Sequence, residues 1–207
     1  MIPRQLHAFW GGPPMPDHLA RNLDAWRDMH PGWDLTLWTP DAVPELRHQR
    51  YYDHPERYSP KSNVWQYRTN ILRYELLHDL GGWWIDCDLE PRRPIDELRR
   101  HRLVAAWELQ CRHINNALIG AEPGHPALKT IIDGIPASIK RQPRRRSTWQ
   151  TGGHYITPIL RDRVDVTILD QRLVYPYAWN ELHRAGEPFP DAYAVHHWHN
   201  ARTNAGA

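Results

Sequence analysis

The chain has 207 residues, a net charge of +2 at neutral pH and a mean hydropathy of −0.73. This length fits one domain with a buried core, and no stretch is long and apolar enough to cross a bilayer. The N-terminus lacks the apolar segment of a signal peptide, and Cys87 and Cys111 are too few for a disulfide framework. These features exclude a membrane-spanning or disulfide-rich protein. We expect a soluble, cytoplasmic protein with a single domain over residues 1–207.

The first part of the chain alternates between strand and helix patterns. Residues 4–10 predict a strand that ends at the glycine pair 11–12. A helix is predicted from Asp17, because apolar residues then recur at helical spacing. These residues are Leu19, Leu23, Trp26 and Met29. Residues 33–37 alternate between apolar and polar side chains, so strand, helix and strand predict a βαβ unit in a parallel sheet.

The middle of the chain continues this alternation. A long helix is predicted over residues 64–80, where apolar side chains recur on one side. Gly81 and Gly82 end this helix, and residues 83–87 form a short apolar strand directly after them. Further strands are predicted at residues 103–107, 117–121 and 166–169.

Two further helices complete the pattern. One begins near Pro126 and is weakened by Gly134 and Pro136, since neither residue favours a helix interior. The other lies within residues 149–162. Because strands and helices alternate without a linker between them, we predict one α/β/α sandwich with a mostly parallel central sheet.

Asp86 and Asp88 follow the apolar run of the strand predicted at residues 83–87. Side chains alternate along a strand, so both carboxylates are expected on one face with Cys87 opposite. Two adjacent carboxylates repel each other unless a cation lies between them, and oxygen ligands suit Mg²⁺ or Mn²⁺. Asp-x-Asp also occurs in ordinary surface loops. The glycines and the apolar run before it favour a divalent-ion site at the end of a buried strand.

Six segments resemble, in the same order, the DXD-containing glycosyltransferases. They are Ile2 to Gly11, Asn70 to Tyr74, Leu80 to Asp88, Asn116 to Pro126, Thr151 to Gly153 and His196 to Trp198. The family has a GT-A-like (Rossmann-like) fold, and the resemblance spans nearly the whole chain. Its members include fungal Golgi mannosyltransferases, bacterial capsular polysaccharide transferases and, more remotely, the glucosylating clostridial toxins.

The resemblance implies a retaining glycosyltransferase that uses a nucleotide-diphospho sugar, such as a UDP- or GDP-sugar, together with Mn²⁺ or Mg²⁺. It assigns Asp86 and Asp88 to catalysis and to the ion. A histidine near the C-terminus completes the ion's ligands, and we favour His196 over His197. If this segment is a strand, the two histidines point to opposite faces, so one of them is the ligand.

The resemblance also implies a set of donor-binding residues. Arg73 lies one helical turn after Asn70, so both share one face, and Arg73 is expected to act in catalysis as well. Trp10 ends the first strand, at the sheet edge where ligands of open α/β sheets bind. Its indole is expected to stack on the nucleobase, with a place in the core as the alternative. The other donor-binding residues are Trp84, Asp86, Asn116 and Trp198.

Three positions depart from the family pattern. The family has an aspartate where this chain has Asn70 and a tyrosine where it has Trp84. Gly153 stands where the family has a proline. Asn70 keeps the capacity for hydrogen bonds but loses the negative charge, and Trp84 is bulkier than the residue it replaces.

Other features of the sequence bear on the choice of acceptor and on the competing functions. A phosphatase with an Asp-x-Asp nucleophile needs Thr or Val two residues after the second aspartate, where this chain has Glu90. The basic tract at residues 140–146 is typical of a solvated loop, but it also offers contacts to phosphates of DNA. We therefore expect a saccharide acceptor. The alternatives are a hydroxymethylated base in DNA, or a non-catalytic module that binds a polyanion or glycan.

Overall fold

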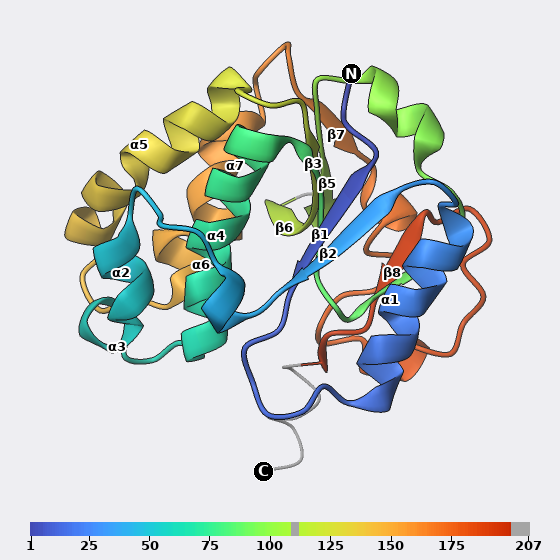
Figure 1. Cartoon of the computed structure of the whole chain (residues 1–207), viewed down its shortest axis with the longest axis horizontal. Helices are drawn as coiled ribbons and strands as arrows, with labels where there is room; N and C mark the ends of the chain where they lie inside the picture. Colours follow the sequence, from blue (N-terminus) through green and yellow to red (C-terminus); the bar gives the residue numbers. More distant parts are fainter. Residues whose placement is uncertain (109–111, 200–207) are drawn as a thin grey trace.

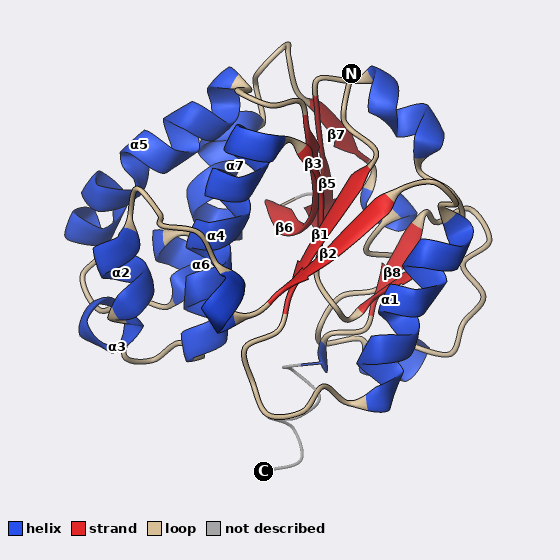
Figure 2. Ribbon diagram, in the orientation of Figure 1, coloured by secondary structure: helices blue, strands red, loops and turns tan. Residues whose placement is uncertain are grey.

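The computed structural model describes residues 1–108 and 112–199, so Cys111 lies outside the described residues. Six strands form the central sheet (Figures 1 and 2). In spatial order they are β2 (Asp34–Trp38), β1 (Gln5–Phe9), β3 (Gly82–Ile85), β6 (His113–Ala121), β5 (Leu103–Glu108) and β7 (Thr167–Leu169).

The predicted mostly parallel sheet is confirmed. β1 is parallel to β2 and β3, and β5 is parallel to β7. β6 is the exception, because it runs antiparallel to both β3 and β5. The predicted βαβ unit consists of β1, helix α1 (Asp17–Met29) and β2. The carboxyl ends of β1 and β2 lie at the lower edge of the sheet in Figure 1, and a loop leads from the end of β1 to the first turn of α1.

Helices cover one face of the sheet, and a mixed layer covers the other (Figure 2). The first layer holds α4 (Val64–Leu80), α5 (Pro126–Arg141) and α7 (Gly153–Leu160), with the shorter α2 (Gln49–Asp53), α3 (Pro55–Tyr58) and α6 (Ser147–Gln150) beside them. The second layer holds α1 and a two-stranded sheet of β4 (Leu89–Pro91) and β8 (Ala194–His196). Short 3-10 helices lie at Pro40–Ala42, Asp96–Arg100, Gln171–Leu173 and Leu182–Arg184.

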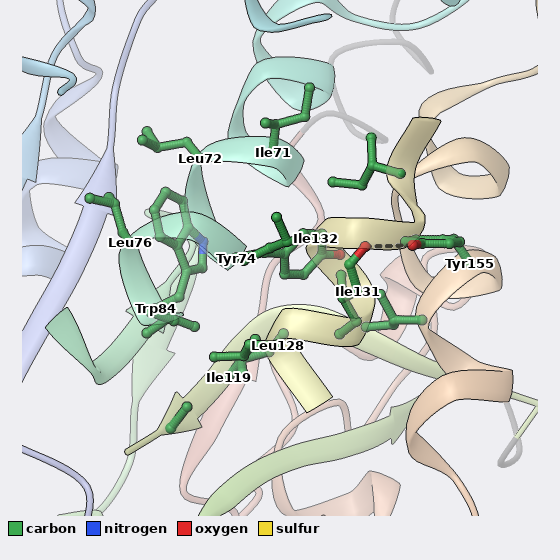
Figure 3. Packing of buried hydrophobic residues seen from close by; sticks show 14 of the residues in the cluster. Ile71, Leu72, Tyr74, Leu76, Trp84, Ile119, Leu128, Ile131, Ile132 and Tyr155 are labelled. Atoms are coloured by element: carbon green, nitrogen blue, oxygen red, sulfur yellow. Dashed lines mark hydrogen bonds between the residues drawn. The ribbon is translucent and has the colours of Figure 1, made fainter. Parts of the chain in front are cut away.

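Each face of the sheet buries its own apolar core. Adjacent residues of β3 enter different cores, because strand side chains alternate: Trp84 packs against α4 and α5, and Trp83 packs on the α1 side. Figure 3 shows Trp84 beside Leu72 and Leu76 of α4. Trp83 lies across Gly120 of β6, where an added Cβ would come within 2.5 Å of the indole. The bulk of Trp83 therefore requires glycine at position 120.

Helix α5 continues through the two residues that weakened its prediction. Pro136 has no N–H, so the carbonyl of Ile132 loses its usual helical donor. His48 replaces this donor, with its Nε2 2.7 Å from the Ile132 oxygen. At Gly134, an added Cβ would lie 2.5 Å from the hydroxyl of Tyr155. That hydroxyl donates to the carbonyl of Ile131 (Figure 3). Tertiary contacts thus preserve the helix through both positions.

Helix α4 positions most of the polar residues discussed below. Asn63 caps its first turn, since the side-chain oxygen accepts from the backbone N–H groups of Trp65 and Gln66. The helix ends at Gly81, whose φ of 68° is costly for any other residue. The strand with the two tryptophans begins at the next residue. In the described part of the chain, no helix has the length and apolar character needed to cross a membrane.

Candidate active site at the DXD turn

Asp86 and Asp88 lie in a turn directly after β3, which corrects the predicted strand over residues 83–87. The strand ends at Ile85. The Asp86 N–H still donates to the carbonyl of Ala117, and the Leu89 N–H closes the turn on the carbonyl of Asp86, both at 2.9 Å. A tight turn, rather than strand alternation, therefore brings the carboxylates together. As predicted, Cys87 points away from them, and its thiol is buried against the carbonyl of Phe9.

The start of β3 is held by a buried histidine of the first strand. His7 donates from Nε2 to the carbonyl of Gly81 at 3.0 Å, and its Nδ1 accepts from the Trp38 indole at 3.3 Å. Gly82 has a φ of 91°, and an added Cβ there would lie 2.6 Å from the carbonyl oxygen of Gln5. The close approach of β1 thus fixes the strand that leads into the DXD turn.

Two side chains from different elements orient the carboxylate of Asp86. The indole of Trp84 donates to Asp86 Oδ1 at 2.7 Å, and Arg73 of α4 lies 3.2 Å from the same oxygen. Burial raises the pKa of Asp86 and the charge of Asp88 adds to this effect, while the Arg73 guanidinium opposes it. Overall the pKa of Asp86 is raised, so keeping its carboxylate ionised in this site costs free energy.

Arg73 is buried and uses its whole guanidinium. It donates to the carbonyls of Thr69 and Asn116, and its plane lies over the Trp84 ring, 4.9 Å from the ring centre. Its side chain is 3% exposed, so Arg73 is not an ordinary exposed arginine, and its catalytic role stays a prediction. A planar group with this many partners fixes Asp86 relative to β6.

Asn70 and Asn116 join α4 to β6 beside this arginine. The amide of Asn116 donates to Asn70 Oδ1 at 3.0 Å and to the Tyr74 hydroxyl at 2.8 Å. Asn70 in turn donates to the hydroxyl of Thr151 at 3.2 Å. The Asn70 amide serves as acceptor and donor at once, which an aspartate could not do without a proton. This network gives a physical reason for asparagine at position 70.

Asp88 interacts with the C-terminal segment, which β8 brings back to the DXD turn. His196 Nε2 lies 3.1 Å from Asp88 Oδ1, and the His199 N–H donates to Oδ2 at 2.8 Å. Burial alone would raise the pKa of Asp88, but His196 and these hydrogen bonds outweigh it, so the pKa is lowered. Burial works to lower the pKa of His196, and the Asp88 charge raises it overall. Without an ion, the two groups form a buried ion pair.

The two residues that follow His196, which are His197 and Trp198, have other contacts. His197 Nε2 lies 2.7 Å from Glu90 Oε2, and its Nδ1 is 3.2 Å from the Tyr177 hydroxyl, so it faces away from the two aspartates. Trp198 is buried, with its indole donating to the Tyr177 carbonyl at 3.2 Å and its ring edge-on to His196 at 4.1 Å. In this position Trp198 supports the imidazole of His196 directly.

The chemistry of Asp86, Asp88 and His196 fits a divalent ion. One ligand atom from each residue can be chosen so that all lie within 4.8 Å of one another. The Nδ1 atom of His196 is buried and has no hydrogen-bond partner among the described residues. Two carboxylates and an imidazole suit Mn²⁺ or Mg²⁺.

Trp10 lies at the carboxyl end of β1, as predicted, but its indole is not free. Its N–H donates to the Pro13 carbonyl at 2.6 Å, and the half-buried ring packs against the α1-side core. A cleft of about 770 Å³ opens on that side of the sheet and reaches Asp88. Its lining includes Arg21 and Asn22 of α1, but neither Arg73 nor Trp10. The role of Trp10 in base stacking stays a prediction.

The structure adds residues that the sequence analysis did not select. Glu108, at the carboxyl end of β5, accepts from the Asn115 amide at 2.6 Å. Burial raises the pKa of Glu108, and that hydrogen bond and the nearby charges of His196 and His113 counteract this. A carboxylate at the end of an apolar strand is the same signal that marked Asp86. It passed unnoticed because nothing in the sequence showed that β5 ends beside the C-terminal histidines.

Residues 16–105 match the family profile described as "Glycosyltransferase sugar-binding region containing DXD motif". The predicted resemblance to the DXD glycosyltransferases is confirmed. Inositol phosphoceramide mannosyltransferase 1 of Schizosaccharomyces pombe is 25% identical over 138 residues, which cover 65% of this chain and 43% of that protein. The chain thus spans less than half the length of this relative. An uncharacterized glycosyltransferase of Acanthamoeba polyphaga mimivirus is 22% identical, covering 85% of this chain and 74% of its own length.

Solved glycosyltransferases share the fold. The PaToxG glycosyltransferase superposes with a TM-score of 0.63 at 13% identity, covering 79% of this chain and 70% of that one. The galactosyltransferase LgtC, in complex with donor and acceptor sugar analogs, gives a TM-score of 0.53 at 10% identity, over 93% of this chain and 86% of its own. The predicted GT-A-like fold is therefore confirmed.

Proposed function

We propose that this chain transfers a sugar, with retention of configuration, from a UDP- or GDP-sugar to a hydroxyl of a saccharide, with Mn²⁺ or Mg²⁺ as cofactor. The observation that carries the proposal is the meeting of Asp86, Asp88 and His196 from two distant segments, with Arg73 paired to Asp86. Retention rests on the family resemblance. We keep the cytoplasm as the proposed compartment on the basis of the cysteine content.

Asp86, Asp88 and His196 would hold the ion, and the ion when bound neutralises charge on the leaving diphosphate. Other residues of the chain hold the carboxylates of Asp86 and Asp88 in position. Trp84 and Arg73 fix one carboxylate oxygen of Asp86, so its other oxygen is free of both contacts. The backbone N–H of His199 fixes Asp88. Preorganised ligands of this kind lose little free energy to rearrangement when charge develops.

The donor sugar is proposed to lie beside Arg73, Asn70 and Asn116. These residues form one hydrogen-bonded group next to Asp86, and such a group can hold sugar hydroxyls at fixed positions. The mannosyltransferase names of the fungal relatives support a hexose donor. A UDP-bound toxin glycosyltransferase of similar fold, with a TM-score of 0.56, supports a nucleotide donor.

Asp88→Ala tests the proposal. Turnover should fall by on the order of 10² or more, because the site loses one ligand of the ion that would neutralise charge on the leaving diphosphate. Release of nucleoside diphosphate from a panel of nucleotide sugars with Mn²⁺ measures this, and thermal unfolding shows that the variant is folded. Asp170→Ala, which removes a carboxylate paired with Arg172 elsewhere on the surface, is the matched control. Full activity of the Asp88 variant, or of the wild type in excess chelator, would contradict the proposal.

The same assay separates the competing classes. A phosphatase would release phosphate from generic phosphoesters and would not require a nucleotide sugar. A non-catalytic glycan or polyanion module would release no diphosphate, and its binding would survive the Asp88 substitution. Cleavage of one nucleotide sugar that depends on Mn²⁺ and on Asp88 distinguishes the transferase from both.

A further inference from the structure

The basic tract at residues 140–146 consists of two parts with different environments. Lys140 and Arg141 end α5, where cations interact favourably with the helix dipole. Arg144, Arg145 and Arg146 follow in the loop before α6, and all three are exposed. None of these three forms an ion pair with a carboxylate within the described ranges 1–108 and 112–199. The loop therefore presents three positive charges without an internal counter-charge.

This loop is held by hydrogen bonds to a buried serine, Ser59, and a half-buried serine, Ser62. Ser59 donates to the carbonyl of Arg145 at 2.6 Å, and the Ser147 N–H donates to the hydroxyl of Ser62 at 2.6 Å. Arg144 has a φ of 59°, an uncommon conformation for a residue with a side chain, which the surroundings must impose. The loop therefore presents its exposed side chains from an anchored backbone.

The guanidinium of Arg145 rests on an aromatic stack. It lies 5.0 Å from the ring centre of Trp149, a distance typical of a cation–π contact. The other face of Trp149 is covered by His154, stacked at 3.7 Å and 9°, and His154 contacts His113 of β6 edge-on at 4.0 Å. Burial, with the charge of His113, lowers the pKa of His154 to about 4, so this ring is neutral at pH 7. The stack thus places one charged group at a fixed position.

The stack lies at a short distance from the DXD turn along two elements. Ser147 donates to Gln66, and from Gln66 to Arg73 is seven residues of α4, or about 10 Å at the helical rise. Along β6, His113 precedes Asn116 by three residues, or about 10 Å at the strand rise. Thr151, which follows α6, also contacts Asn70 directly. These contacts connect the loop that carries Arg145 to Asn70 and to the helix of Arg73, which are the residues proposed above to hold the donor.

We propose that Arg145, held on Trp149, is the anion-binding residue of the acceptor subsite, so that the acceptor is a saccharide bearing a phosphate or carboxylate. This inference rests on the proposed transfer to a saccharide and specifies its class of acceptor. A planar guanidinium without a carboxylate partner is suited to bidentate contact with either anion. DNA requires a longer row of phosphate contacts than three adjacent arginines in one turn provide, so the small anionic acceptor is favoured.

The test compares four probes by calorimetry: glucose, glucose 6-phosphate, glucuronate and a duplex oligonucleotide with hydroxymethylcytosine. Nucleoside diphosphate and Mn²⁺ are present at saturation, so that a phosphate probe does not occupy the ion site. The wild type should bind glucose 6-phosphate or glucuronate at least tenfold more tightly than glucose. Arg145→Ala should remove about tenfold or more of that affinity, the usual effect of losing a hydrogen bond to a charged group. Which acid binds better identifies the anion.

Three further variants test for an effect of general charge and for the role of the Trp149 ring. Arg172→Ala removes one exposed arginine far along the chain, so it should leave the affinities unchanged. Trp149→Phe keeps a ring and should lose less affinity than Trp149→Ala. Equal affinity for glucose and both acids, or unchanged affinity in Arg145→Ala, would overturn the proposal. Tight binding of the duplex would also overturn it if the affinity falls with salt concentration as steeply as several phosphate contacts require, because the loop would then be assigned to DNA.

A measurement of donor cleavage distinguishes a failure of the acceptor inference from a failure of the proposed function. Arg145→Ala should still release nucleoside diphosphate from the nucleotide sugar in the absence of an acceptor, because Arg145 is outside the ion and donor residues. If the wild type cleaves no donor at all, the proposed function fails, and the calorimetry still reports on the anion site. If cleavage is intact and no acid binds, the acceptor inference alone fails.

Discussion

Arg73→Ala should destabilise the protein because it leaves Asp86 without its positive partner. Arg73 is 3% exposed at its side chain, and Asp86 is 30% exposed. Removing one member of a buried ion pair costs about 3–5 kcal/mol, and the partial exposure of Asp86 puts the expected loss near 3 kcal/mol. That loss is a large fraction of the roughly 5–15 kcal/mol by which domains are stable, so the variant should fold but unfold at lower denaturant.

Urea unfolding at pH 7 measures this loss, with Arg68→Ala as the matched control. Arg68 lies on the same helix, donates to the carbonyls of Tyr52 and Asp53 and contacts the rings of Tyr52 and Trp65, but it has no carboxylate partner among the described residues. Its removal should cost about 1 kcal/mol, the value of ordinary hydrogen bonds. The second part of the test is a cycle with Asp86→Asn. In that background Arg73→Ala should cost less, because no buried charge is left behind.

A loss below about 1 kcal/mol for Arg73→Ala, on the scale of a single neutral hydrogen bond, would refute this reasoning. An equal loss in the presence and absence of the Asp86 charge would also refute it, because the effect would then come from packing against Trp84. Donor cleavage should fall in Arg73→Ala in either case, so activity alone does not distinguish the two. Arg73→Lys should recover part of the stability, since it keeps the charge without the planar fork.

Two further predictions concern the first strand. Trp10→Ala should weaken binding of the free nucleoside diphosphate by on the order of 1–3 kcal/mol, as measured by calorimetry, through loss of a base–aromatic contact; unchanged affinity in a folded variant would assign Trp10 to the core. The stability of the protein should fall as the pH drops below 6.5, because burial lowers the pKa of His7 below its ordinary value of 6.5. Below pH 6.5 the unfolded chain binds a proton at this histidine that the folded protein does not bind. The contribution of His7 to stability is therefore fully present above pH 6.5 and decreases as the pH falls below it. Urea unfolding between pH 8 and 5 checks this, and His7→Gln, which can still donate to Gly81, should show a weaker pH dependence; an unchanged profile would contradict the role of His7.

The local sequence was sufficient for the order of the longer strands and helices and for the identity of the DXD residues, but it did not show β4 or the turn after β3. The bounds of α4 at residues 64 and 80 agree with the prediction, because a capping asparagine and a glycine mark its two ends. The strand with Trp83 and Trp84 could be recognised from its glycines and apolar run. Such signals lie within a few residues of the element that they specify, so they are readable without knowledge of the fold.

Other features depended on contacts between distant segments. α5 continues past Pro136 because His48 supplies the missing donor, and no local pattern contains that information. The antiparallel direction of β6 likewise follows from pairing with β3 and β5. In each case a residue far away in the sequence satisfies a backbone group that local propensity leaves unpaired.

The candidate site shows the same division. The sequence by itself determined which residue types are available: two carboxylates, a histidine pair near the C-terminus, and an arginine one turn after Asn70. The tertiary structure decided that His196 faces Asp88 while His197 turns to Glu90, since β8 pairs with β4 in one register. It also decided that Arg145 rests on Trp149. Packing of the whole chain sets these placements, because the free energy that fixes each side chain comes from neighbours that are far apart in the sequence.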